Sequence, residues 1–143
     1  LELIKVNPYK INHVRNLFII LARKKFHISH ISLPTYKEHK NFVENHPYRF
    51  WYFILNDEKY IGVIYVTFEN VIGINTIISS KELYINAIEA IINTHKPLEE
   101  IKSVRNKFFV INVNPNNKTL IEAIKLIGLS HIQNTYILKN KFK

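Results

Sequence analysis

The sequence contains no cysteine, and this absence removes several kinds of chemistry at once. Disulfides, thiolate zinc sites and a cysteine nucleophile all require a side chain that the protein does not have. Methionine is also absent, and there are only three glycines, Gly62, Gly73 and Gly128. Because position 1 is Leu1, we expect that the chain lost its initiator or was cut from a longer polypeptide.

Long apolar runs are absent as well. The most apolar stretch, residues 17–21, is flanked by Arg15 and Arg23 and is far shorter than the roughly 18 residues needed to cross a bilayer. Residues 1–6 lack the basic and apolar regions of a secretory signal. We therefore expect a soluble protein in a reducing, cytoplasmic setting, without a membrane partner.

The composition that remains is that of a globular protein. With 143 residues, of which 47% are apolar and 22% charged, the chain should form a single domain over residues 1–143. A net charge of +9 favours an anionic partner, namely nucleic acid, a membrane surface or a phosphate-bearing small molecule. A general bias of the source toward lysine, asparagine and isoleucine explains the charge equally well.

The spacing of apolar residues predicts the order of helices and strands. Thr35 and Glu38 have the spacing of a helix-capping box, and Gly128 is suited to end the last helix. A loop is expected at residues 25–34, a polar turn at 56–58 and a short helical turn at 97–105. Helices are predicted at residues 11–24, 35–44, 81–93 and around 120–127, and strands at 1–6, 50–55, 60–68, 71–78, 108–113 and 132–138, the last as a strand or short hairpin.

This order, β-α-α-β-β-β-α-β-α-β, resembles that of the GNAT superfamily of acetyl-CoA-dependent N-acyltransferases. Residues 53–64, with their polar turn and the Ile61-Gly62 step, are similar to the family's second and third strands. Residues 113–117, followed by Gly128, resemble its pattern of strand, asparagine, helix and glycine. The expected fold class is therefore α/β, with a mixed sheet of α+β type and a GNAT-like fold.

The resemblance implies an acetyl-CoA site at the start of the helix at residues 81–93. In the family, a loop of the form Q/R-x-x-G-x-G/A offers backbone N–H groups to the pyrophosphate. The matching residues here are 81–86, in which Tyr84 and Asn86 replace the two glycines, whose lack of a Cβ allows close approach of the phosphates. The expected cofactor-binding residues are Ile77, Ile78, Ser79, Ser80, Lys81, Tyr84, Asn86 and Asn117, of which Asn117 corresponds to the family's pantetheine-binding asparagine.

Helix capping is the alternative role for three of these residues. Ser79 and Ser80 precede a helix, where a serine hydroxyl commonly accepts a backbone hydrogen bond. Asn117 is equally suited to cap the helix that follows it, and the two roles can coexist.

No residue of the sequence matches the family's usual group for proton transfer. The family's usual acid, a tyrosine seven residues after the asparagine, is replaced by Ile124. The candidate catalytic residues are therefore Tyr136 and His39, with Tyr84 as a further possibility. Residues 69–70 could orient a water, although a turn is the favoured interpretation.

His39 also bears on the substrate. Residues 34–42 resemble the second helix of GNAT enzymes that acetylate an amino group on a nucleotide-linked sugar, which implies a substrate of that class. A packing role is the alternative, because a histidine within a short helix is more often a packing or surface residue.

Two other patterns have a simpler explanation. His27 and His30 have a spacing that could hold a metal, but they lie in a predicted loop without a third ligand, so we expect no metal. Residues 50–53, beside Arg49, could stack on nucleic-acid bases, but strand alternation places about half of them in the core.

The sequence therefore predicts an N-acetyltransferase-like protein that moves an acetyl group from acetyl-CoA to a primary amine, an amino sugar or sugar nucleotide being the favoured class. The alternative is a catalytically degenerate GNAT-fold binding module, or a domain of a larger enzyme. A basic nucleic-acid binder is the least favoured hypothesis.

Overall fold

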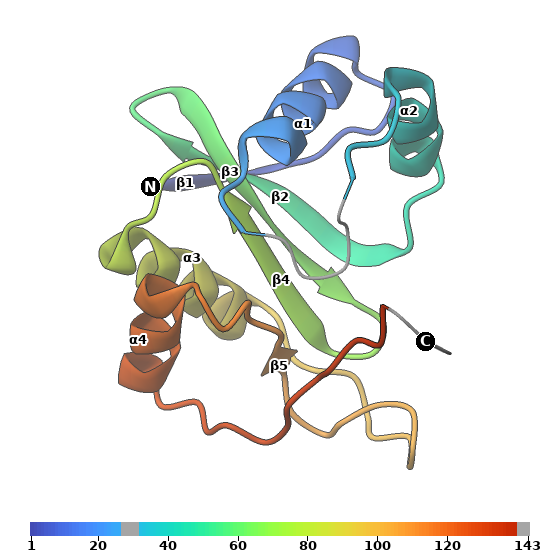
Figure 1. Ribbon diagram of the computed structural model, residues 1–143. Helices are drawn as coiled ribbons and strands as arrows, with labels where there is room; N and C mark the ends of the chain where they lie inside the picture. Colours follow the sequence, from blue (N-terminus) through green and yellow to red (C-terminus); the bar gives the residue numbers. More distant parts are fainter. Residues whose placement is uncertain (27–31, 140–143) are drawn as a thin grey trace.

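The computed structural model describes residues 1–26 and 32–139, which form a mixed sheet covered by helices on both faces (Figure 1). The predicted α+β class with a mixed sheet is confirmed. The elements are β1 (Glu2–Lys5), α1 (Ile11–Arg23), α2 (Tyr36–Glu44), β2 (Tyr48–Asn56), β3 (Lys59–Thr67), β4 (Val71–Thr76), α3 (Lys81–Thr94), β5 (Val110–Ile111) and α4 (Lys118–Ile127).

The five strands lie in the sheet in the order in which they occur along the chain. β1, β2, β3 and β4 pair antiparallel with their neighbours, whereas β5 is parallel to β4. The parallel ladder contains only two pairs, Val71 with Val110 and Ile72 with Ile111. A parallel neighbour requires a crossover connection, and α3 supplies it.

Alternation along β2 separates the two apolar layers. Trp51 and Phe53 pack with the buried side chains of α1 and with Val43 of α2. Ile54 points to the opposite face and packs with buried residues of α3 and α4. The chain's single tryptophan, Trp51, is only 7% exposed, and its Nε1–H has no hydrogen-bond partner among the described residues.

The predicted helix ends are confirmed. Thr35 and Glu38 form the expected capping box, since each side chain accepts a hydrogen bond from the other residue's backbone N–H at 3.2 Å. Gly128 ends α4 in a left-handed conformation with φ of 105°, where a residue without a Cβ is favoured.

Two predicted strands differ from the structure. Residues 132–138 form no strand, and their large apolar side chains are exposed. The strand expected at 108–113 is confined to Val110–Ile111, and Phe108 is 70% exposed. Because β5 offers so short a ladder, a further strand has little backbone to pair with.

The segment at 97–105 is a closed loop rather than a helical turn. Ile101 and Arg105 form an isolated antiparallel bridge, and Ser103 has a left-handed φ of 66°. The Arg105 side chain donates to the backbone oxygens of Phe68 at 2.7 Å and Glu99 at 2.8 Å. These contacts close the loop and tie it to the turn that follows β3.

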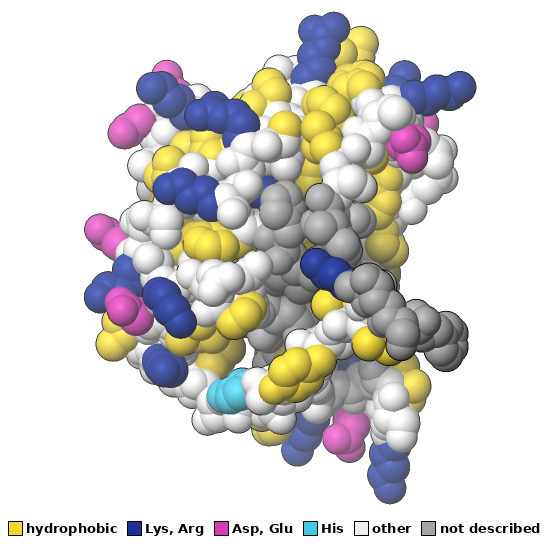
Figure 2. Space-filling view, viewed as in Figure 1, with side chains coloured by type: hydrophobic (Ala, Val, Ile, Leu, Met, Phe, Trp, Pro, Cys, Tyr) yellow, Lys and Arg dark blue, Asp and Glu magenta, His cyan; other side chains and the backbone are white. Residues whose placement is uncertain are grey.

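The surface carries the positive charge expected from the composition. On the face shown in Figure 2, lysine and arginine side chains outnumber carboxylates. Within residues 1–26 and 32–139, no helix is both long enough and apolar enough to cross a bilayer.

Candidate functional site

The predicted acetyl-CoA residues from Ile77 to Asn86 lie where β4 leads into α3. The Ile77 N–H donates to the Ile61 oxygen at 2.9 Å, which continues the edge of the sheet by one residue. Ser79 is exposed. Ser80 is the N-cap of α3, and its hydroxyl accepts the Leu83 N–H at 3.2 Å. The capping role of Ser80 is therefore confirmed, and its binding role stays a prediction.

Lys81 connects the first turn of α3 to α4. Its ammonium nitrogen lies 3.8 Å from a carboxylate oxygen of Glu122, and both side chains are well exposed. An exposed ion pair of this kind is weak, so the ammonium can exchange Glu122 for an anionic ligand. Asn86, one turn later, is exposed.

Tyr84 points into the core. It is only 3% exposed, and its hydroxyl lies 3.2 Å from Oγ1 of Thr76, which in turn donates to the Ile78 oxygen at 2.6 Å. The ring therefore does not cover the outer surface of the helix start, where a side chain in place of the family's glycine would obstruct phosphates. The first-turn N–H groups of α3 and the Lys81 ammonium are the donors that an anion at this helix start would meet.

Asn117 is the N-cap of α4. It is buried, and its side-chain oxygen accepts the Leu120 N–H at 3.2 Å. The capping role is confirmed, and the pantetheine contact stays a prediction.

His39 joins α2 to α1. It is buried, its Nε2 lies 3.2 Å from the Val14 oxygen, and its ring lies edge-on to Phe18 at 5.2 Å. Burial lowers the pKa of His39, with the Val14 hydrogen bond acting in the opposite direction. The packing role is thus seen directly, and the catalytic role stays a prediction.

Tyr136 and Asn70 have contrasting surroundings. Tyr136 is 87% exposed in the segment after α4, so its hydroxyl is accessible to a ligand.

Asn70 is fully buried, and its side chain makes hydrogen bonds of 2.8 Å with the Leu98 N–H, the Leu98 oxygen and the Asn106 oxygen. The structural role expected for Asn70 in the turn is confirmed.

The metal and nucleic-acid patterns gain no support. His27 and His30 lie outside the described residues, and the described residues contain no group of three or more potential ligands that could hold a metal. In residues 49–53, Trp51 and Phe53 are core residues, and the Arg49 side chain donates to the Lys96 oxygen at 2.9 Å.

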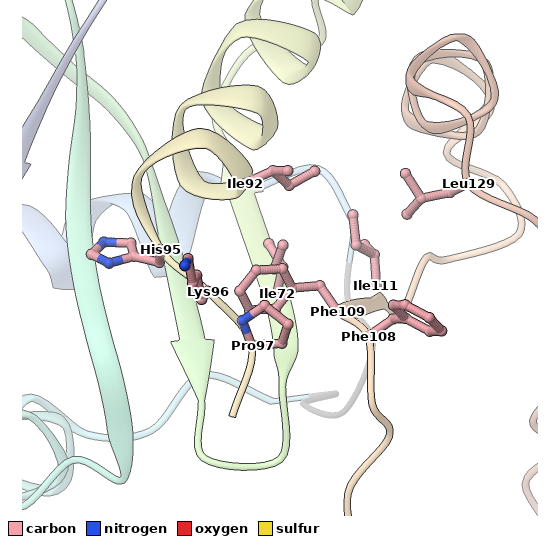
Figure 3. A pocket seen from close by; sticks show the side chains of 9 residues that line it. All are labelled: Ile72, Ile92, His95, Lys96, Pro97, Phe108, Phe109, Ile111 and Leu129. Carbon is pink, nitrogen blue, oxygen red and sulfur yellow. The ribbon is translucent and has the colours of Figure 1, made fainter. Parts of the chain in front are cut away.

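A cavity that the sequence did not predict lies at the other end of α3 (Figure 3). Its volume is about 330 Å³. The walls come from α3, β4, the start of β5 and the chain just after α4. Residues so far apart in sequence give no local pattern, although the exposed Phe108 beside a short apolar run was a possible signal.

A histidine and a tyrosine secure the end of α3 beside this cavity. The Tyr52 hydroxyl and His95 Nε2 are 2.8 Å apart, and the His95 ring stacks on Phe50 with 3.7 Å between ring centres. Burial and the nearby Arg49 charge lower the pKa of His95, while burial raises the pKa of Tyr52. Both side chains are thus held in their neutral forms.

Two other histidines make stability depend on pH. Nδ1 of His13 accepts the Asn7 N–H at 2.8 Å, and Nδ1 of His46 accepts the Tyr48 N–H at 3.1 Å. Burial lowers the pKa of both, and Lys10 lowers the pKa of His13 further. Because the folded pKa values lie below the unfolded value of about 6.5, stability is full above that pH and is lost as the pH falls through it.

We therefore expect the melting temperature to fall by several degrees between about pH 7.5 and about pH 5, which calorimetry can measure. His13→Gln should reduce this slope, because the unfolded chain then gains one proton fewer. His131→Gln, which changes an exposed histidine, is the control variant. A melting temperature that stays constant or rises over this range would contradict the assignment.

Comparisons with known proteins give no relative for this arrangement. No protein-family model matches the chain, and no curated protein or solved structure matches it either.

Proposed function

We propose that the chain is a GNAT-like N-acyltransferase, which transfers an acetyl group from acetyl-CoA to a primary amine such as an amino sugar or sugar nucleotide. The observation that carries the proposal is the fork between β4 and β5. The two strands pair only at Val71 and Ile72, while β4 continues to Thr76. Since α3 begins just beyond the end of β4, the fork opens toward the start of this helix (Figure 1).

The fork suits an extended ligand with amides and phosphates. In the described chain, residues 73–76 pair with β3 on one side and with no strand on the other. A strand edge of this kind offers backbone groups to the amides of a pantetheine arm. The first-turn N–H groups of α3 and the Lys81 ammonium favour the phosphates. Tyr84 is buried in the core, with its hydroxyl 3.2 Å from Oγ1 of Thr76.

In the proposed reaction a carbon–nitrogen bond forms and a carbon–sulfur bond breaks. The amine nitrogen attacks the thioester carbonyl carbon, the carbon–sulfur bond breaks, the thiolate takes a proton, and the new amide nitrogen loses one to water. We assign the proton donor to Tyr136, whose exposed hydroxyl is accessible to a ligand. His39 Nε2–H donates to the Val14 oxygen, so Nδ1 of this buried ring is the nitrogen that would act as a base.

Calorimetric titration with acetyl-CoA tests the site. We expect saturable binding to one site, and Lys81→Glu should weaken it about tenfold, because it places a negative charge at the helix start. Lys59→Glu is the matched control, since Lys59 is exposed at the beginning of β3. Absence of binding, or equal loss in both variants, would contradict the proposal.

Turnover can be followed with a thiol reagent. Because the protein contains no cysteine, any free thiol in the assay comes from released coenzyme A. We expect thiol release with amino sugars or sugar nucleotides, and Tyr136→Phe should lower the rate without changing acetyl-CoA binding.

A binding module without catalysis is the second candidate. Ser80 and Asn117, both predicted to contact acetyl-CoA, are engaged as helix caps, and Ile124 stands where the family has its acid. Saturable binding of acetyl-CoA with no thiol release for any amine would favour this second candidate.

A further inference from the structure

The cavity at the end of α3 has the dimensions of a small-ligand site. Its volume of about 330 Å³ lies at the small end of the roughly 300–1,000 Å³ found for ligand pockets. Ile92 of α3, Ile72 of β4, Phe108 just before β5 and Leu129 after α4 surround it (Figure 3). Aliphatic and aromatic side chains therefore form most of the wall, and the interior suits an apolar group.

Part of this wall is in contact with water. Phe108 and Ile92 are among the exposed large apolar residues. Contact with water is unfavourable for apolar surface, so an apolar occupant that covers these side chains is stabilised.

The rim of the cavity is positively charged. Nine described residues line the cavity, and two of them, Lys96 and His95, have titratable side chains. Lys96 is the one that carries a positive charge at neutral pH. The Lys107 ammonium lies 5.8 Å from the centre of the Phe108 ring. The His95 ring is turned toward Tyr52 and Phe50 on β2 and stays neutral there. Apolar walls beside ammonium groups complement a molecule with an aliphatic chain and one anionic end.

Hydrogen bonds hold the backbone beside the cavity without a ligand. Asn70 holds the backbone of Leu98 and Asn106, and the contact between Tyr52 and His95 holds the last turn of α3. A preformed cavity avoids much of the ordering cost of binding, so even a small ligand can bind measurably.

We propose that this cavity binds a medium-chain fatty acid. The aliphatic chain enters between Ile92, Phe108 and Leu129, and the carboxylate pairs with Lys96. The site is independent of the one proposed for acetyl-CoA, because Lys81 stands at the opposite end of α3. That helix has 14 residues, which corresponds to a length of about 20 Å.

Amide NMR shifts of the ¹⁵N-labelled protein provide the test, with butanoate, hexanoate, octanoate and octanol as probes. Saturable shifts are expected at the last turn of α3, at the start of β5 and at Leu129. The Kd should fall by up to about fourfold for each added methylene group until the cavity is filled. Octanol should bind more weakly than octanoate, by a factor of about three or more, because it lacks the charge that Lys96 attracts.

Matched variants test the charged rim and the apolar wall of the cavity separately. Lys96→Glu should weaken octanoate and leave octanol unchanged, whereas Phe108→Ser should weaken both. Lys102→Glu and Phe68→Ser alter exposed residues outside the cavity lining and should change neither. Since Lys96 and Phe108 are themselves exposed, both variants should fold, which thermal melting checks.

Three results would overturn the proposal. They are shifts that map away from the cavity, an affinity that does not depend on chain length, and octanoate binding that survives both Lys96→Glu and Phe108→Ser. None of these readouts uses acetyl-CoA, so failure here is distinguishable from failure of the acyltransferase proposal.

Discussion

Replacement of Asn70 by alanine is expected to lower the free energy of unfolding by about 3–5 kcal/mol. The Asn70 side chain makes three hydrogen bonds, two as donor and one as acceptor from the Leu98 N–H. Each such bond contributes about 1 kcal/mol, and a buried group left without a partner costs about 1–3 kcal/mol. Asn70 also has a left-handed φ of 65°, which disfavours alanine by about 1–2 kcal/mol.

Urea unfolding of a short series separates these contributions. Asn70→Gly tolerates the left-handed backbone but loses the side chain, so it should be less destabilised than Asn70→Ala by about 1 kcal/mol. Asn70→Asp keeps the acceptor for Leu98 but turns both donors into repulsive contacts. Glu69→Ala, at the exposed neighbour, should stay within about 0.5 kcal/mol of the parent. A loss below about 1 kcal/mol for Asn70→Ala would contradict the role assigned here.

Replacement of Gly73 by alanine should cost about 3 kcal/mol, because the new methyl group would overlap the Tyr65 ring. Gly73 and Tyr65 are direct partners in the ladder between β3 and β4, and the ring lies across the glycine. Tyr65 cannot easily move, since its ring stacks on Tyr48 with 4.1 Å between ring centres.

A double-mutant cycle isolates this overlap. Tyr65→Leu removes the obstructing ring, so Gly73→Ala should cost about 1–2 kcal/mol less in that background. Gly128→Ala is the control, because no atom lies near its added Cβ and its cost arises from the left-handed backbone alone. The cost of Gly128→Ala should be the same with and without Tyr65. If the cost of Gly73→Ala is also unchanged, the overlap is not its cause.

The sequence predicted the elements whose causes are local. The Thr35 capping box, the polar turn between β2 and β3 and the Gly128 helix end each depend on a few neighbouring residues, and each is present. Residues 132–138 have equally good apolar composition, but a strand also requires a partner. β5 offers only two residues, so composition alone gave the wrong prediction.

The candidate site was predicted less completely, because side-chain direction depends on the phase of a helix. The sequence placed Ile85, Ile88, Ile91 and Ile92 on one side of α3, and the structure buries Ile88 and Ile91 but leaves Ile92 exposed. Tyr84, which the family resemblance placed at the ligand, lies on the buried side with Ile88 and Ile91. The cavity near His95 arises from four distant segments and had no local pattern to reveal it.

Trp51 gives the molecule an internal optical reporter. Its indole is shielded from water by the edges of Tyr48 and Phe42, with an N–H that has no acceptor among the described residues. An indole in such surroundings emits at short wavelength, and its emission moves to the red once water reaches it. Because Phe42 belongs to α2 and no other tryptophan contributes, detachment of α2 from the sheet has its own fluorescence signal. Loss of α3 or α4 on the opposite face would first appear in circular dichroism, so the two layers can be observed separately in one unfolding experiment.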